Sequence, residues 1–157
     1  KASETGSGLF ILAHTSNKGS KDIQEMPLTI GIKCYEHLAI ILKPIVEKHK
    51  GILGLSSIGV VSGATFKEEA IALRKMLPSA PFLIPGYGAQ GASAKDACAP
   101  LIQDLVHLDL QNFGLINASR SISFPEESYL ANNIEEWQKI ILTKIHSTNN
   151  ELKSINY

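Results

Sequence analysis

Two segments of the chain carry residues that suit a bound phosphate. Residues 81–93 read PFLIPGYGAQGAS and place three glycines around one amide side chain, Gln90. Glycine permits positive φ and lets backbone approach a ligand closely, so this spacing indicates more than a plain turn. Arg120 directly follows an apolar run. A guanidinium at such a position needs an anion, and its planar fork fits a phosphate.

Each of these residues also has an ordinary explanation. Arg120 could pair with a carboxylate of a neighbouring helix, and Gln90 could bond to the backbone of its own loop. For Arg120 the sequence leaves both explanations open. The other arginine, Arg74, stands near Glu68 and Glu69, so we expect it on a solvated helix face.

A third polar segment, Thr15-Ser16-Asn17, follows the first apolar run. An isolated segment of this type is typical of a turn that caps its neighbours. Alternatively, Ser16 offers donor and acceptor atoms to a polar heterocycle. We expect the adjacent His14 to be a partly buried histidine whose hydrogen bonds are satisfied.

The elements that must position these residues follow from hydrophobic periodicity. Nearly continuous apolar runs predict buried strands at residues 9–13, 58–61, 82–84 and 115–118. Helical patterns occupy residues 32–46, 65–77, 93–100 and 133–146, and capping signatures open the second, third and fourth at Thr65, Ser93 and Asn133. We expect Pro44 to kink the first helix and the polar tail after His146 to fray.

The alternation of strands and helices predicts an α/β fold with parallel strands and right-handed crossovers. Four such units suit either a small open sheet or half of an eight-stranded barrel. We expect residues 1–157 to form a single domain segment. Because the chain begins with Lys1 rather than Met, we expect a piece of a longer chain or a processed product. In such folds ligand groups gather at the carboxyl ends of the strands, so the three polar segments should meet.

Composition argues against several function classes. The formal net charge is +0, so no basic surplus favours nucleic acid or an anionic membrane. The apolar runs are far shorter than a membrane span. Cys34 and Cys98 are distant and lack metal-ligand spacing, so we expect free thiols. The five histidines show no paired spacing, and we predict no metal site.

Taken together, four segments resemble successive blocks of the orotidine 5'-phosphate decarboxylases, most closely the bacterial branch with the longer chain. They are HTSNKGSKDIQ (residues 14–24), GVVSGATFKEE (59–69), FLIPGYGAQGAS (82–93) and INASRSISF (116–124). The resemblance covers nearly the whole chain, and PGYGAQG followed by SRSI is its most specific part. Ser62 departs from the usual VVGAT block and is expected to disturb the end of the second strand.

The resemblance implies a (β/α)8 TIM barrel of which this chain supplies the C-terminal half, about four βα units. It also implies removal of CO2 from orotidine 5'-phosphate to give UMP, in the cytoplasm, without metal or organic cofactor. The implied partners are the N-terminal half of the barrel and, for the complete enzyme, a second copy in a homodimer. No nucleic acid or membrane partner is implied.

For the site, the resemblance implies that Ser16 bonds the pyrimidine edge and that Gln90 and Arg120 hold the phosphate, with backbone amides helping. The implied substrate-binding residues are Thr15, Ser16, Gly88, Gln90, Ser119 and Arg120. The family's catalytic lysine and aspartates lie on a DxKxxD motif in the first half of the barrel. The four aspartates here, Asp22, Asp96, Asp104 and Asp109, form no such motif. We therefore expect no catalytic residue in this segment, which should be inactive alone.

Two other functions stay open. One is a different phosphate-binding barrel enzyme, such as a sugar-phosphate isomerase or a tryptophan-pathway enzyme. The other is a non-catalytic half-barrel that binds or assembles through its two unpaired strand edges.

Overall fold

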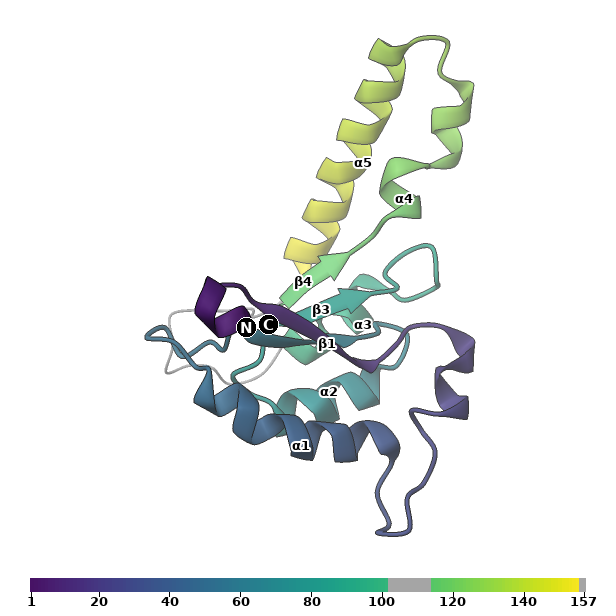
Figure 1. Ribbon diagram of the computed structural model, residues 1–157. Helices are drawn as coiled ribbons and strands as arrows, with labels where there is room; N and C mark the ends of the chain where they lie inside the picture. Colours follow the sequence, from purple (N-terminus) through teal and green to yellow (C-terminus); the bar gives the residue numbers. More distant parts are fainter. Residues whose placement is uncertain (102–113, 156–157) are drawn as a thin grey trace.

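The computed structural model describes residues 1–101 and 114–155, and the described chain forms one parallel sheet with helices (Figure 1). The strands are β1 (Leu9–His14), β2 (Ile58–Ser62), β3 (Phe82–Pro85) and β4 (Gly114–Asn117). Their order in the sheet is β1-β2-β3-β4, and every pair is parallel. The four predicted strands are confirmed to within one residue at each end.

Helices lie between the strands along the chain, and two more follow the last strand. They are α1 (Cys34–Lys48), α2 (Lys67–Met76), α3 (Ala94–Cys98), α4 (Arg120–Ser123) and α5 (Ile134–Ser154), with short 3-10 turns η1 (Ala2–Thr5), η2 (Lys18–Asp22), η3 (Ala99–Leu101) and η4 (Glu126–Leu130). Pro44 is accommodated inside α1. Successive parallel strands that are sheet neighbours, joined by helices, give the arrangement of half of a (β/α)8 barrel.

The core lies between one face of the sheet and α1 and α2. In Figure 1 these two helices run side by side along that face, and they contact each other. Leu42 and Val46 of α1, together with Leu73 of α2, bury their side chains against Val60 and Phe82. The periodic apolar positions predicted for these helices are therefore those that fill the core.

The opposite face of the sheet is more open than its sequence predicts. Nearly continuous apolar strands suggested cover on both faces, yet Leu12 in β1 is 56% exposed and Leu115 in β4 is 61% exposed. In a complete barrel such positions are filled by side chains of other strands rather than by helices. The exposed apolar side chains are therefore those that a half-barrel leaves uncovered.

The pairing of β1 with β2 is irregular near its end. Leu12 pairs with Val61 and His14 with Ser62, so Ala13 is an extra residue in β1. Ser62 was expected to disturb the end of β2. Instead it continues β2 as a paired residue, and the irregularity lies opposite it in β1.

The helix boundaries confirm two predicted caps and correct a third. Ser93 and Asp96 form a reciprocal capping box at α3, and Asn133 accepts a hydrogen bond from the Glu136 amide at α5. Thr65 does not cap α2, which begins at Lys67 without a side-chain cap. Its hydroxyl donates to a carbonyl across the sheet instead, as described below.

The prediction of a frayed tail after His146 is wrong. Helix α5 continues to Ser154, Thr148 is buried, and Leu152 packs against the core cluster. The polar composition that suggested fraying covers only the outer face of these turns. Tertiary packing of the inner face keeps them helical.

Candidate functional site

The carboxyl ends of the four strands bring the three polar segments to one edge of the sheet. Thr15 and Ser16 follow β1, residues 86–91 follow β3, and Ser119 and Arg120 follow β4. Because all four strands are parallel, these ends lie on the same side. The topology therefore places the three segments along the same edge of the sheet.

Ser16 and Gln90 converge on Gly86. A Cβ built on Gly86 would lie 2.8 Å from the Ser16 Cβ and 3.0 Å from the Gln90 Oε1. Gly86 also has a φ of 103°, which L side chains rarely adopt. Glycine is therefore required here both by backbone conformation and by space, and its absence of a side chain leaves the serine and the amide close together.

The same loop reaches the segment after β4. A Cβ on Gly88 would lie 2.8 Å from the Ser121 Oγ, and Gly88 has a φ of 74°. The Gly88 amide donates to the Ala92 carbonyl, which closes the loop on itself. The loop that carries Gln90 thus packs against the residue next to Arg120.

Arg120 is exposed and opens α4. Within residues 1–101 and 114–155, no carboxylate lies within ion-pair distance of it and no hydrogen bond joins it to Gln90. Ser119, just before it, donates its hydroxyl to Asn117 Oδ1 at 3.3 Å. The described residues thus offer no carboxylate partner for Arg120, and its guanidinium is accessible to solvent.

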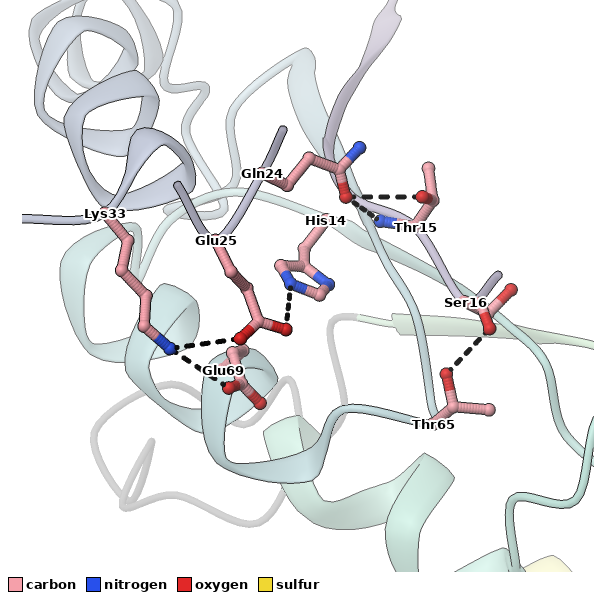
Figure 2. A network of polar contacts seen from close by, with 8 residues as sticks. All are labelled: His14, Thr15, Ser16, Gln24, Glu25, Lys33, Thr65 and Glu69. Carbon is pink, nitrogen blue, oxygen red and sulfur yellow. Dashed lines mark hydrogen bonds and ion pairs between the residues drawn. The ribbon is translucent and has the colours of Figure 1, made fainter. Parts of the chain in front are cut away.

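The backbone around Ser16 is held from two sides (Figure 2). Thr65 donates its hydroxyl to the Ser16 carbonyl at 2.9 Å, which is why it does not cap α2. Gln24 Oε1 accepts two hydrogen bonds from Thr15, one from its amide at 2.8 Å and one from its hydroxyl at 3.2 Å. Thr15 is therefore committed to protein contacts, and the Ser16 main chain is fixed by its neighbours.

Next to Ser16 lies a charged cluster around a buried histidine, which the sequence did not predict. His14 is 1% exposed and packs edge-on against the rings of Tyr35 and Phe66, with centroids 5.3 and 4.6 Å away. Its Nε2 lies 3.6 Å from Glu25 Oε1, which is too long for a hydrogen bond. The expectation of a satisfied histidine is wrong, because neither ring nitrogen has a hydrogen-bond partner among the described residues.

Burial and neighbouring charges have opposite effects on the pKa values of His14 and Lys33 in this cluster. Desolvation lowers the pKa of His14, although Glu69 and Glu25 partly offset it, so the imidazole is held neutral. For Lys33, desolvation opposes the charge, but contacts with Glu25 at 3.3 Å and Glu69 at 3.6 Å outweigh it and raise the pKa. Figure 2 shows Lys33 reaching both carboxylates beside His14. The group thus combines two carboxylates and one ammonium with a neutral imidazole next to the end of β1.

Arg74 is not on a solvated face, so that prediction is wrong. It is 4% exposed, lies over the Phe82 ring at 3.8 Å, and donates to the carbonyls of Pro78, Ala80 and Pro100. Desolvation lowers its pKa to about 10. The nearby Glu68 and Glu69 suggested a solvated face, whereas α2 places the Arg74 side chain inside the protein, where it bonds three main-chain carbonyls.

Tyr87 ties the glycine loop to the C-terminal helix. It is 7% exposed, and its hydroxyl donates to Glu151 Oε2 at 2.6 Å. Burial, followed by Glu151, raises the pKa of Tyr87 to about 12, so the phenol stays protonated near neutral pH. Sequence reasoning missed this contact, because the two residues are 64 positions apart.

The described residues hold no further chemical cluster. No three His, Cys, Asp or Glu side chains in the described ranges are grouped to hold a metal ion, and none of the described helices is long and apolar enough to cross a membrane. Cys34, at the start of α1, is a free thiol, and Cys98, at the end of α3, is buried. Asp96 caps α3 and Asp22 ends η2, whereas Asp104 and Asp109 lie outside the described residues.

Comparison with known proteins gives one consistent family. No protein-family model matches the chain. It is 45% identical over 115 residues to orotidine 5'-phosphate decarboxylase of Clostridium kluyveri, which is 73% of this chain and 37% of that protein. The corresponding protein of Clostridium tetani is 43% identical over 119 residues, or 76% of this chain and 39% of that protein. The chain thus spans well under half of the length of these relatives.

Solved structures agree on the fold. The UMP synthase of Leishmania donovani is 30% identical with a TM-score of 0.52, covering 87% of this chain and 28% of that one. A Toxoplasma gondii structure described as an orotidine-monophosphate-decarboxylase has a TM-score of 0.66 at 24% identity, covering 99% of this chain and 55% of that one. The four βα units are therefore shared with these longer structures.

Proposed function

We propose, from the premise that this chain is homologous to part of the orotidine 5'-phosphate decarboxylases, that it carries the phosphate- and pyrimidine-binding side of such an enzyme. The observation that supports this most is the convergence of Ser16 and Gln90 on Gly86. A hydroxyl and an amide at one point can bond a pyrimidine edge and an adjacent phosphate oxygen. We assign residues 1–157 to the C-terminal half of the barrel.

Each site residue has a distinct role in this proposal. Arg120 offers a planar pair of N–H donors to the phosphate, and its exposure leaves those donors available. Gln90 bonds the phosphate from the glycine loop, with backbone amides near Gly88 and Ser119. Ser16 bonds the pyrimidine, and Thr15 contributes by fixing the main chain that carries Ser16.

The reaction would convert orotidine 5'-phosphate to UMP and CO2. Breaking the bond to the carboxylate leaves a carbanion, so the reacting centre needs an ammonium group that donates a proton to it, with aspartates beside the departing carboxylate. This chain supplies the remote binding energy rather than those groups. Energy from a phosphate grip far from the breaking bond can be used to orient the substrate at the reacting centre.

The catalytic lysine and aspartates would come from the rest of the barrel. The sheet of the described residues ends at β1 on one side and β4 on the other, each with a single neighbour. We propose that these edges pair with the N-terminal half, and that the complete enzyme is a cytoplasmic homodimer of the pyrimidine pathway.

Nucleotide binding tests the proposal. Calorimetry should give a measurable Kd for UMP, and Arg120→Ala should weaken binding by about 2 kcal/mol, roughly thirtyfold, because a charge-assisted phosphate contact is lost. Gln90→Ala should weaken it by about 1 kcal/mol. Gln138→Ala, an exposed amide on α5, serves as the control and should bind like the parent.

Two results would contradict the proposal. One is an unchanged Kd for UMP in Arg120→Ala, and the other is ribose 5-phosphate binding as tightly as UMP, which would indicate a different phosphate-binding barrel. Mixing the chain with an N-terminal half and following loss of orotidine 5'-phosphate absorbance tests the reaction itself. No turnover with both pieces folded would reject the half-barrel assignment.

A further inference from the structure

The glycine loop after β3 has one buried anchor and an exposed tip. Tyr87 is buried, whereas residues 88–91, including Gln90, are exposed. The Gly88 amide donates to the Ala92 carbonyl and the Gly91 amide donates to the Gly88 carbonyl, so the tip is a closed turn. Tyr87 and Ala92 form its base and are bridged to each other. The orientation of Tyr87 therefore sets where the tip places Gln90.

The buried anchor is held by the far end of the chain. The Tyr87 hydroxyl donates to Glu151 Oε2 at 2.6 Å, and Thr148, one turn earlier on α5, is buried. Tyr87 lies between two glycines of positive φ, Gly86 and Gly88. Glycines are permissive, so the backbone alone does not fix the tyrosine. The side-chain bond to α5 supplies the constraint.

Helix α5 contacts the elements on both sides of the proposed phosphate site. Besides bonding Tyr87, it packs against α3, which follows the glycine loop, and against α4, which carries Arg120. Leu152, in the last turns of α5, packs against the core. One helix is thus positioned to fix the spacing between the loop with Gln90 and the helix with Arg120.

We propose that the Tyr87–Glu151 hydrogen bond is a tether that holds the glycine loop in its phosphate-binding position, so that Tyr87 and Glu151 are positioning residues for the nucleotide. The proposal rests on the proposed function for its ligand. The tether itself concerns the loop and can be measured without any ligand.

The variants Tyr87→Phe and Glu151→Gln remove or weaken the tether while keeping side-chain size. Tyr129→Phe, at a tyrosine that is 75% exposed, and Glu135→Gln, an exposed glutamate at the start of α5, are the matched controls. Amide hydrogen exchange in the free protein should speed up in residues 86–92 for the first pair and not for the controls.

The Kd values for UMP and uridine distinguish a role in positioning the loop from a general loss of structure. In the tether variants the Kd for UMP should rise about tenfold, while the Kd for uridine, which lacks the phosphate, should change less than about twofold. The double variant should bind UMP no more weakly than the worse single variant, since both remove one interaction.

Unchanged exchange of residues 86–92 in both variants would overturn the tether. Equal losses of affinity for UMP and uridine would overturn its role in phosphate binding. If the parent chain binds no UMP, the proposed function fails by itself, and the exchange measurement still decides whether Tyr87 and Glu151 hold the loop.

Discussion

His14 is a buried imidazole whose surroundings include both carboxylates and aromatic rings. The two carboxylates are Glu25, which follows η2, and Glu69 of α2, and Lys33 contacts both of them. The rings of Tyr35 and Phe66 cover the imidazole. The carboxylates favour a charged ring, whereas burial favours a neutral one, and burial prevails. Because of this balance, the contribution of His14 to the free energy of unfolding depends on pH.

The sign of that dependence follows from the lowered pKa. Above the ordinary value of 6.5, His14 is neutral in both states and contributes no pH dependence. Below 6.5 the unfolded chain binds a proton that the folded chain resists, so the free energy of unfolding should fall as the pH drops towards the folded pKa. The slope from this residue is at most about 1.4 kcal/mol per pH unit.

Denaturant unfolding between pH 7 and pH 5 measures this slope. His14→Gln should show a smaller loss of unfolding free energy across that interval than the parent does. His146→Gln, at an exposed histidine on α5, should keep the parent's slope. An equal slope in His14→Gln and the parent would show that another group carries the acid sensitivity.

Single residues also mark the limit of sequence reasoning. Gln90, Ser16 and Arg120 could be selected because chemistry after a strand end is a local pattern. The Gln24–Thr15 and Tyr87–Glu151 contacts could not, because each partner is an ordinary polar residue whose role depends on the packing of distant segments.

At the scale of the elements, the strands were predictable and the helix faces were less so. An apolar run bounded by turn residues identifies a strand without knowledge of its neighbours. Whether a polar residue of a helix faces solvent depends on what packs there. Arg74 shows this, since the helix around it carries Glu68, Glu69 and Lys75, yet its own side chain is buried and bonds carbonyls outside α2.

Arg74→Leu should therefore destabilise the docking of α2. It would leave the buried carbonyls of Ala80 and Pro100 without the guanidinium that bonds them, and we expect a loss of about 3 kcal/mol in unfolding free energy. Circular dichroism during denaturant unfolding is the measurement. Lys75→Leu, at the exposed neighbouring position, should change stability by less than about 0.5 kcal/mol. Similar losses in both variants would contradict a specific role for the buried guanidinium.

At the scale of the whole molecule, the sheet is open at both edges in the described part of the chain. β1 and β4 present unpaired main-chain groups together with the exposed side chains of Leu12 and Leu115. Such edges favour pairing with another sheet. The sequence predicted four βα units, but it could not show which apolar side chains lack cover, because that depends on the rest of the barrel.

The isolated chain should therefore self-associate. Light scattering at increasing concentration should show a rising mass, and the double variant Leu12→Glu/Leu115→Glu should lower it with little change in unfolding free energy. Leu142→Glu on α5, at a leucine that is 55% exposed, is the control and should associate like the parent. A mass that stays equal to that of the monomer at every concentration would show that the two edges do not drive self-association.

The extra residue at Ala13 decides which side of the sheet receives a titratable ring. With regular pairing, His14 would fall on the face of the sheet that Leu12 and Val61 share, where the Leu12 side chain is exposed. With Ala13 unpaired, His14 aligns with Ser62 and turns towards Tyr35 and Phe66 instead. A one-residue bulge in β1 thus places a titratable imidazole among the rings of the core side and keeps it off the open face of the sheet.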